Sequence, residues 1–539
     1  MAEFDFIIIG AGSAGCVLAN RLSESGKHKV LLLEAGDSDF RFFVQMPIGY
    51  GISFFDKAVN WCYRTEEDKG LGGRNGYWPR GKVLGGSSSI NAMVFIRGQH
   101  ADFDRWEAMG NPGWGWDGVK PYFLKMEDNQ AGANEWRSQG GPLHVADVKD
   151  EYHPANKHFL EAARELDLPI NEDFNGETQE GAGYYQITTK GGIRMSTARA
   201  YLRPAMKRSN LTVLTKAQVS KIVFEGKRAV GVEYVRNGKT ERVTAKREIV
   251  LSAGAVNSPQ ILQLSGVGPK ETLKRHKIEQ VCEAPAVGRN LADHLAFTYY
   301  YKSSIPTLND KLNSWPKKIM LGIKYVLTRK GTLSLGVNQA GGFLKTRSEL
   351  DEPNVQLYFA PVTYTTNGPL ERPLMSPDPF SAFHIGIQPC HPTSRGHIEI
   401  KSNDPNEPPA IYPNSLSTNH DVEEMLEAAK LMKKLMSTKA LGEIATEPMM
   451  AEQENDDDEA IIDFVRKNAS TVFHPVSTCR MGPDDGTNVV DARLKVHGLE
   501  GLRVADASIF PTITAGNTNA PTIMVGEKAS DLILDDVSE

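Results

Sequence analysis

The segment from Phe4 to Glu34 reads FDFIIIGAGSAGCVLANRLSESGKHKVLLLE, and it decides the fold of the first part of the chain. The apolar run Phe4–Ile9 is suited to a buried parallel strand, and it leads into the glycine-rich turn GAGSAG at residues 10–15. Apolar residues at helical spacing follow over Cys16–Ser23, and a second apolar run, Lys29–Leu33, ends at Glu34. The order of these pieces predicts one strand–helix–strand unit.

The turn fits the pattern GxGxxG, in which each glycine has its own physical role. Gly10 permits the tight turn, Gly12 lets the backbone approach a pyrophosphate, and Gly15 lets the helix and strand pack closely. The N-terminus of the helix offers free N–H groups and a partial positive charge to phosphates. This context predicts a dinucleotide site, against the alternative of a glycine turn that holds no ligand.

Glu34 closes the second strand, 19 residues after Gly15. A carboxylate at this place can accept hydrogen bonds from both ribose hydroxyls and would repel a 2′-phosphate, so an NADP-type ligand is disfavoured. The pattern itself does not separate FAD from NAD. Its N-terminal position leaves more than 500 of the 539 residues to surround a bulky flavin, which favours FAD slightly.

The bulk composition is typical of a globular protein and gives no sign of a nucleic-acid partner. Hydrophobic residues make up 40% of the chain and charged residues 24%. The formal net charge is −6, from 61 basic and 67 acidic residues, which is too mild to indicate binding to nucleic acid. At roughly 100–200 residues per domain, the length allows two to four domains.

The cysteines and the N-terminus predict a cytoplasmic protein without a bound metal. The cysteines show no CxxC pair and no metal-ligand spacing, so we expect reduced thiols at Cys16, Cys62, Cys282, Cys390 and Cys479. Glu3 and Asp5 stand where the basic region of a signal peptide would be. No apolar stretch reaches the roughly 18 residues of a spanning helix, so we expect a soluble or peripheral protein.

A second glycine-rich stretch, GKVLGGSSSIN, lies within Gly70–Gly98, a segment that we expect to be a long loop. Its glycines and serines could press the backbone against a flat ring or a phosphate, and Arg80 and Lys82 add positive charge. The alternative is a flexible linker. The apolar residues Met93–Ile96 that follow favour a buried loop instead.

The remainder of the chain divides into two regions that differ in composition and in the pattern of apolar residues. Strand-length apolar runs recur between residues 211 and 252 and lead into a predicted helix at Ser258–Leu264. Between roughly 300 and 465 there are more prolines and aromatic residues, alternating runs such as Val355–Phe359, and a predicted helix near Asp421–Ser437. We interpret this second region as a distinct, substrate-facing domain.

Five stretches, taken in order along the chain, resemble the signatures of the glucose–methanol–choline (GMC) oxidoreductase family. They are Gly81–Asp104, Gly254–Pro259 continuing through Ser265–Gly268, FHPV at 473–476, VADAS at 504–508 and GNTNAPT at 516–522. The resemblance covers essentially the whole chain. Within the family, the chain is most similar to bacterial choline-dehydrogenase-like and medium-chain alcohol dehydrogenases.

The resemblance implies a fold of the α/β plus α+β class. A Rossmann-like FAD-binding domain would be interleaved with an antiparallel-sheet substrate-binding domain. We assign residues 1–155, 190–298 and 465–539 to the FAD-binding domain, and residues 156–189 and 299–464 to the substrate-binding domain.

The resemblance also implies which residues contact FAD. Those that would hold its ADP half are Gly10, Gly12, Ser13, Ala14, Gly15, Glu34, Ala35 and, through its backbone at the adenine, Val219. Those that would line the isoalloxazine are Val83, Gly86, Asn91 and Val94. Asp506 and Ala507 would lie near the ribityl chain and pyrophosphate, and Asn519 and Thr522 near the pyrimidine end of the flavin.

Ile90 marks a departure from part of the family. Some members link FAD covalently through a histidine at this position, and isoleucine cannot form that bond. We therefore predict non-covalent FAD.

His474 and Asn517 are the catalytic residues that the resemblance implies. His474 would face the flavin and act as the base, and Asn517, 43 residues downstream, would hydrogen-bond the substrate oxygen. The chemistry explains the residue type, because a neutral imidazole with an ordinary pKa of about 6.5 can take the hydroxyl proton as a hydride leaves. Taken alone, one of thirteen histidines is more often structural, and Asn517 could be a turn residue after Gly516.

These residues together predict FAD-dependent oxidation of an alcohol, in the first place a primary aliphatic or aryl alcohol, to the aldehyde. No charged constellation plainly seats choline, although the directions of the aromatic residues Tyr358, Phe359, Tyr364, Phe380 and Phe383 are open. The electron acceptor is also open between a quinone or other carrier and dioxygen. The further alternatives are a choline dehydrogenase, a relative with decarboxylase or lyase chemistry, and a non-catalytic dinucleotide-binding protein.

The segment Trp315–Lys330 is basic and amphipathic. Such a helix could lie on an anionic membrane surface and approach a quinone pool. More often such a helix covers the protein's own core, and this is the interpretation we favour. A peripheral contact with the inner face of the cytoplasmic membrane stays the alternative.

Overall fold

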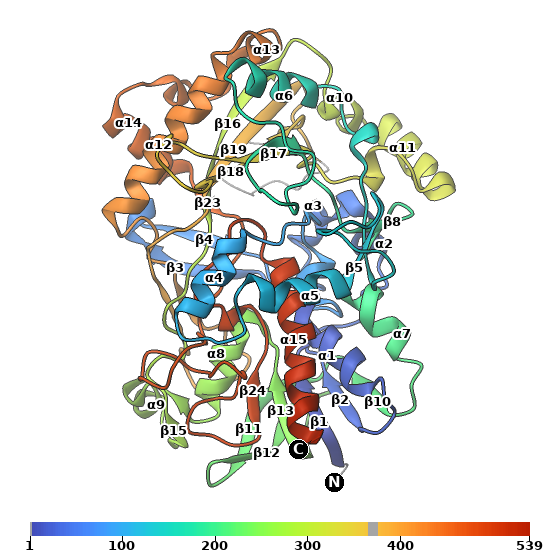
Figure 1. Ribbon diagram of the computed structural model, residues 1–539, viewed down its shortest axis with the longest axis vertical. Helices are drawn as coiled ribbons and strands as arrows, with labels where there is room; N and C mark the ends of the chain where they lie inside the picture. The colour runs from blue at the N-terminus through green and yellow to red at the C-terminus, as the bar shows by residue number, and fades with distance from the viewer. Residues whose placement is uncertain (1–2, 365–375, 539) are drawn as a thin grey trace.

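The computed structural model describes residues 3–364 and 376–538 of the chain. Figure 1 shows two sheet-containing halves stacked along the long axis, with both chain termini at the lower end. The lower half contains the strand that begins the chain, and the upper half contains strands from its middle.

A seven-stranded sheet in the order β10-β2-β1-β13-β12-β11, with β24 also paired to β13, forms the lower half. The strands β10, β2, β1, β13 and β24 run parallel, whereas β13, β12 and β11 form an antiparallel meander. Their bounds are β1 Glu3–Ile9, β2 Val30–Leu33, β10 Leu211–Leu214, β11 Gln218–Glu225, β12 Arg228–Arg236, β13 Lys239–Leu251 and β24 Leu502–Val504. The predicted Rossmann-like sheet is confirmed.

The helix α1 (Ser13–Ser23) connects β1 to β2, as the opening segment predicts, and packs against α15 (Asn519–Ser538). It begins three residues before the predicted start, because Ser13, Ala14 and Gly15 already form its first turn. A Cβ atom on Gly15 would lie 1.9 Å from the carbonyl oxygen of Gly10. Only glycine therefore lets the helix lie this close to the end of β1.

The upper half is an antiparallel sheet in the order β22-β16-β19-β18-β17-β7, with β23 paired to β16. The bounds are β7 Gly181–Tyr184, β16 Leu295–Ser303, β17 Ala340–Leu344, β18 Val355–Ala360, β19 Ala382–Pro389, β22 Ala445–Pro448 and β23 Ser470–Thr471. Helix α12 (Asn419–Met436) packs on β19. The predicted interleaved fold is confirmed, whereas the domain boundaries stay a prediction, and β16 extends across the one drawn at residue 298.

Shorter elements complete the fold. The remaining helices are α2 Phe42–Gln45, α3 Tyr50–Ser53, α4 His100–Ala108, α5 Trp116–Met126, α6 Asn156–Glu165, α7 Arg203–Ala205, α8 Gly254–Leu264, α9 Lys270–Arg275, α10 Leu308–Leu312, α11 Trp315–Thr328, α13 Lys439–Gly442 and α14 Asp458–Asn468. The remaining strands are β3 Tyr63–Asp68, β4 Arg74–Trp78, β5 Glu127–Asn129, β6 Leu143–Val145, β8 Thr189–Lys190, β9 Ile193–Arg194, β14 Val267–Gly268, β15 Cys282–Glu283, β20 His397–Glu399 and β21 Ala410–Tyr412.

The prediction that Gly70–Gly98 is one long loop is wrong in its first part. The strand β4 pairs antiparallel with β3, and Trp78 lies opposite Tyr63. Both aromatic side chains are buried in a small apolar cluster. Burial of these two rings stabilises a strand that the surrounding glycines obscure in the sequence.

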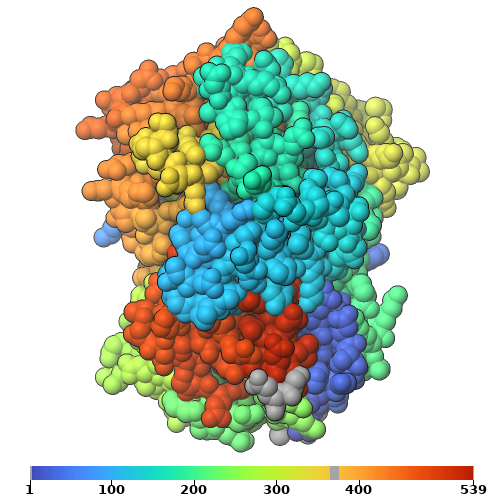
Figure 2. All heavy atoms as spheres, viewed as in Figure 1, coloured from blue at the N-terminus to red at the C-terminus, as the bar shows by residue number. Residues whose placement is uncertain are grey.

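The prediction that Trp315–Lys330 covers the protein's own core is also wrong. In α11 only Tyr325 is buried, whereas most of its large apolar side chains are exposed. Figure 1 shows α11 at the edge of the upper half, and Figure 2 shows the atoms of this part of the chain at the margin of the molecule. The amphipathic pattern is correct, but its apolar face is turned away from the core.

The structure describes all five cysteines, and its described residues can be searched for metal-binding clusters and for membrane-spanning helices. Each of the five cysteines is a free thiol. Within residues 3–364 and 376–538, no group of three or more His, Cys, Asp or Glu side chains is arranged to hold a metal ion. In the same part of the chain, every helix is too short or too polar to cross a bilayer.

Candidate active site

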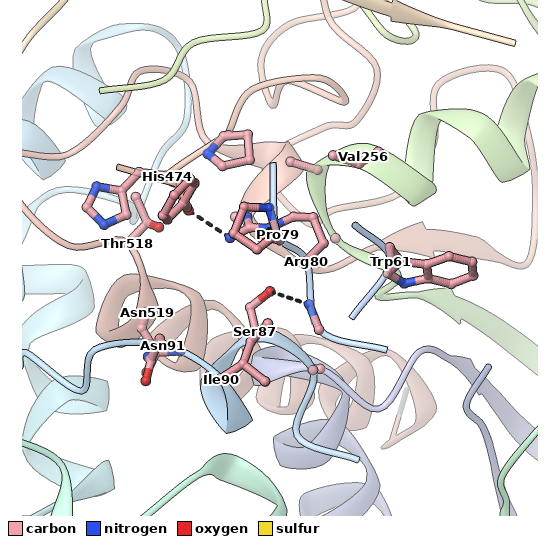
Figure 3. A pocket seen from close by; sticks show the side chains of 18 of the residues that line it. Trp61, Pro79, Arg80, Ser87, Ile90, Asn91, Val256, His474, Thr518 and Asn519 are labelled. Atoms are coloured by element: carbon pink, nitrogen blue, oxygen red, sulfur yellow. Dashed lines mark hydrogen bonds between the residues drawn. The ribbon is translucent and has the colours of Figure 1, made fainter. Parts of the chain in front are cut away.

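A cavity of about 440 Å³ lies where the two halves meet. Its wall combines the first glycine turn, the second glycine-rich loop, the inner face of the upper sheet, the FHPV segment and the start of α15. The predicted site residues in the wall are Gly10, Gly12, Ser13, Ala14, Glu34, Ala35, Gly86, Asn91, Val94, Val219, His474, Asp506, Ala507, Asn517, Asn519 and Thr522. Figure 3 shows His474, Arg80, Ile90 and Asn91 around this cavity.

Two predicted residues lie behind the wall. Gly15 packs on the backbone of Gly10, which serves the close helix–strand contact. Val83 is fully buried in a small cluster with Val44, Val59 and Ile90. The structure therefore places Val83 as packing support for the loop, and not in the surface that faces the cavity.

Glu34 offers a carboxylate at one end of the cavity. Its two oxygens accept hydrogen bonds from the backbone N–H groups of Ala11, at 2.9 Å, and Gly36, at 2.7 Å. Burial raises the pKa of this carboxyl to about 7, while the two N–H groups act in the opposite direction. Each oxygen keeps a lone pair for a hydroxyl donor, so the group fits a ribose diol and disfavours a phosphate.

The two glycine-rich loops touch each other across the floor of the cavity. A Cβ atom on Gly86 would lie 2.8 Å from the Cα of Gly12, and Gly86 has a φ of +53°. A Cβ on Gly12 would lie 3.8 Å from its nearest neighbour, the oxygen of Ser252, so this face of the turn is open. The arrangement gives a bare backbone surface at the N-terminus of α1, which is what a pyrophosphate requires.

Asp506 and Asn519 tie the C-terminal segment to this floor. Asp506 accepts hydrogen bonds from the Gly254 N–H at 2.8 Å and the Ser258 hydroxyl at 2.6 Å. Burial raises the pKa of the Asp506 carboxyl. The Asn519 amide donates to the Ser13 hydroxyl at 2.8 Å, which puts Asn519 beside the first glycine turn.

His474 and Asn517, 43 residues apart in sequence, are brought together at the other end of the cavity. The Asn517 Nδ2 atom lies 3.1 Å from His474 Nε2. On its opposite edge, His474 Nδ1 lies 3.0 Å from Nδ1 of His294, and His294 Nε2 lies 2.9 Å from the carbonyl oxygen of Cys390. His294, His474 and Cys390 are buried, and Asn517 is partly exposed.

This chain of hydrogen bonds assigns the proton positions on both rings. The Cys390 carbonyl can only accept, so His294 Nε2 carries a proton. Burial lowers the pKa of His294 to about 4, so its ring is neutral near pH 7 and its Nδ1 is an acceptor. His474 Nδ1 must then donate to it. The lone pair of His474 therefore lies on Nε2, beside Asn517.

The electrostatic surroundings keep His474 neutral. Burial is the largest cause that lowers its pKa well below the usual value, followed by His294 and the Arg80 guanidinium. Arg80 donates from Nη2 to the carbonyl oxygen of Phe473 at 2.7 Å, as drawn in Figure 3. The backbone N–H of His474 donates to Asp293 at 2.8 Å, so both neighbours hold the loop in place.

His294 and Asp293 are site residues that the sequence analysis missed. They form an Asp–His pair just before β16, and nothing in a single sequence shows that this pair meets a histidine 180 residues away. The only local signal is the juxtaposition of two ionisable residues in the otherwise apolar run Leu291–Leu295.

The half of the cavity near His474 is largely aromatic, and its charged group is the Arg80 guanidinium. Its wall contains Tyr50, Phe54, Tyr300, Tyr358, Tyr364 and His384. Of the five aromatic residues considered for a choline cage, Tyr358 and Tyr364 face the cavity, whereas Phe359 and Phe383 are buried in the core of the upper half. Among the described lining residues, the carboxylates are Glu34 and Asp506, which both lie in the dinucleotide half.

The fold and this cavity define a dinucleotide-dependent oxidoreductase in which a buried histidine, His474, is the candidate base. Comparison with known sequences identifies the family within this class. The GMC oxidoreductase family matches the chain in its N-terminal part over residues 4–296 and in its C-terminal part over residues 392–526. The chain belongs to the GMC oxidoreductase family.

Full-length relatives and solved structures agree with this assignment. The chain is 40% identical to the mitochondrial choline dehydrogenase of Homo sapiens, over 98% of this chain and 90% of that one. It is 42% identical to the alcohol dehydrogenase [acceptor] of Pseudomonas putida, over 98% and 96% of the two chains. The pyridoxine 4-oxidase of "Mesorbium loti" has a similar structure, with a TM-score of 0.88, 30% identity and 98% of both chains covered. The structure of a formate oxidase is also similar, with a TM-score of 0.93 and 26% identity, over 100% of this chain and 99% of that one.

The chain is therefore an FAD-dependent oxidoreductase that acts on CH–OH donors. The residues in the wall of the cavity fit the cofactor on independent grounds. The open face of Gly12 accommodates a pyrophosphate, and the Glu34 carboxylate suits a ribose diol.

Proposed function

We propose that the protein oxidises an uncharged primary alcohol, aliphatic or aryl, to the aldehyde, with His474 as the base. The observation that carries the proposal is the hydrogen-bond chain from Cys390 through His294 to His474, which leaves the lone pair on Nε2, where it accepts from the Asn517 amide in the wall of the cavity. FAD, when bound, supplies the acceptor for the hydride that leaves the carbinol carbon. The chain's own groups must bind the alcohol and take its proton.

His474 takes the hydroxyl proton at Nε2. A neutral imidazole is required for this step, and burial together with Arg80 keeps the ring neutral. Proton transfer to a positioned base typically contributes about 10²–10⁴ to the rate. Asn517, whose amide lies beside Nε2, donates a hydrogen bond to the alcohol oxygen and holds the hydroxyl group in line without titrating.

His294 acts as a positioning residue in this proposal. Its Nδ1 accepts from His474 Nδ1, which fixes both the tautomer and the plane of the catalytic ring. Fixing the tautomer of a histidine base through its second nitrogen is a general device of such sites.

The lining near His474 is largely aromatic, with Arg80 as its charged group, and this favours a neutral substrate over a cation. A quaternary ammonium group would have to rely on cation–π contacts with Tyr300, Tyr358 and Tyr364, because the carboxylates of the described wall lie in the other half. Choline is nevertheless the second candidate, since several relatives about 40% identical to the chain are named choline dehydrogenases.

We further propose that the predicted wall residues contact FAD and that this contact is non-covalent. Ile90 lines the cavity, 2% exposed, and its side chain offers no atom that could bond to a flavin. For the cell compartment we propose the cytoplasm, because all five cysteines are free thiols.

The test is an anaerobic absorbance titration of the purified protein with alcohols from choline to octanol to benzyl alcohol. Bleaching of the flavin band by octanol or benzyl alcohol, with little effect of choline, is the expected result. Bleaching by choline alone would replace the neutral-alcohol proposal. Admission of air then separates an oxidase from a dehydrogenase by the speed of recolouring. A band that no alcohol bleaches would contradict alcohol oxidation and point to lyase or decarboxylase chemistry.

A further inference from the structure

Helix α11 turns an apolar face toward solvent. Trp315, Met320 and Leu327 are 76%, 68% and 78% exposed, and Ile319, Ile323 and Val326 are each more than half exposed. The helix is attached to the protein by its opposite side, where Tyr325 is buried. Six large exposed apolar side chains between Trp315 and Leu327, on one helix, form an unusual surface for a globular protein.

The spacing of these residues makes one continuous stripe. Trp315, Ile319, Ile323 and Val326 follow one another at intervals of four, four and three residues, which places them on the same side of the helix. Met320 and Leu327 widen this stripe on the same exposed side. We name Trp315, Ile319, Met320, Ile323, Val326 and Leu327 the α11 face.

Positive charge surrounds the α11 face. The stretch Lys311–Lys330 contains six basic residues, Lys311, Lys317, Lys318, Lys324, Arg329 and Lys330, and no Asp or Glu. The whole chain, in contrast, has a net charge of −6. Lys318 and Arg329 lie over the rings of Trp315 and Tyr325, so their stems extend the apolar surface while their charges stay at its rim.

We propose that the α11 face docks onto an anionic lipid bilayer, with the helix lying in the plane of the headgroups. An outward apolar stripe that contains a tryptophan and is bordered by lysines is the pattern of an interfacial helix. The fourteen residues of α11 are too few to cross a bilayer and long enough to lie along it.

A second copy of the chain suits the same face poorly. Most protein dimers are two-fold symmetric, so the same patch would meet itself and bring six positive charges against six others. An anionic bilayer supplies the opposite charge and an apolar interior to the same surface.

The inner side of α11 connects the α11 face to the cavity. Tyr325 packs in one cluster with Tyr50, Leu333 and Val337, and two of these, Tyr50 and Val337, belong to the cavity wall. Docking would therefore hold the aromatic half of the cavity near the bilayer, where apolar alcohols concentrate. The docking itself does not depend on which alcohol is oxidised.

The experiment is flotation of the full-length holoprotein with vesicles of phosphatidylcholine alone, or of phosphatidylcholine mixed with phosphatidylglycerol. We expect flotation with the anionic vesicles, which high salt weakens. The double variant Trp315→Gln/Leu327→Gln removes apolar contact, and Lys324→Gln/Lys330→Gln removes two charges. Each basic group near an anionic surface contributes roughly fivefold, so the charge variant should partition at least about tenfold less.

A matched control replaces two exposed apolar side chains outside α11, as Met109→Gln/Met206→Gln, and should float like the wild type. Turnover with a soluble acceptor should be unchanged in all three variants, which shows that they are folded. The proposal is overturned if the wild type does not float with anionic vesicles, or if both α11 variants float as well as the control. A dimer that Trp315→Gln/Leu327→Gln dissociates, without flotation of any form, would assign the face to a second copy instead.

Discussion

Replacing His294 with leucine tests the proton assignment at the heart of the site. Leucine removes the acceptor that lies 3.0 Å from His474 Nδ1 but leaves His474, Asn517 and the FAD contacts in place. The buried Nδ1–H would then have no partner. His474 would shift toward the tautomer that carries its proton on Nε2, and that tautomer cannot accept the proton of an alcohol.

The size of the effect follows from the cost of an unpaired buried donor, about 1–3 kcal/mol. The site shows the full burial that this range assumes, because His294 is 0% exposed and His474 is 9% exposed. At a factor of ten per 1.36 kcal/mol, His294→Leu should lower kcat/KM by roughly 5- to 150-fold. His294→Asn supplies an amide oxygen that can accept from Nδ1, so it should lose much less.

The assay is anaerobic stopped-flow reduction of the flavin by the best alcohol, with FAD content and thermal unfolding measured in parallel. A general loss of structure would reduce FAD content and affect both variants. Loss of the tautomer would slow flavin reduction in His294→Leu and spare His294→Asn. Flavin reduction at the wild-type rate in His294→Leu, in protein that keeps its FAD, would refute the assignment of the base to Nε2.

Five further outcomes follow from the site. His474→Ala should lower turnover by about 10²–10⁴ while FAD content stays normal, and near-normal turnover would remove His474 from the mechanism. Arg80→Met removes a positive charge that lowers the pKa of His474, so the acidic limb of the kcat/KM profile should move to higher pH; an unmoved limb would show that Arg80 does not affect this pKa. Glu34→Ala should weaken FAD binding by roughly tenfold or more, measured by equilibrium titration of the apoprotein, and unchanged affinity would place the ribose elsewhere. Acid precipitation should leave a colourless pellet, because Ile90 cannot hold FAD covalently; a yellow pellet would contradict this. The pKa of His384 is lowered to about 4 by burial, so its neutral form stabilises the fold above pH 6.5, and this contribution to the unfolding temperature should be lost as pH falls from 6.5 toward 4. A thermal scan of His384→Gln over the same pH range should lack that part of the slope.

The parts of the fold that the sequence predicts are those whose signal is local. The strand–turn–helix–strand unit at the N-terminus follows from glycines and apolar runs within thirty residues or so. The start of α1 differs from the prediction by three residues, and the start of each strand differs by one. The strand β4 is missed because its signal is the burial of Trp78 against Tyr63, which depends on partners elsewhere in the chain.

The same distinction applies to the site. All the site residues carried over from the family, except Gly15 and Val83, lie in the wall of one cavity. His294 could not be found in this way, because its role arises only when β16 brings it to His474. For α11 the sequence gives the period of the apolar residues correctly, but the period is the same whether the stripe faces the core or the solvent.

The pairing of β23 with β16 has a consequence for how such an enzyme can diversify. His294 immediately precedes β16, the FHPV segment follows β23, and the two strands are joined at Leu295–Thr471. One short ladder therefore carries both members of the proton-accepting pair as a single unit. Strands β18, β17 and β7 lie beyond β19 in the sheet and can exchange side chains without changing the separation of the two rings. Evolution could in this way alter the preferred alcohol while the proton-transfer geometry is inherited intact.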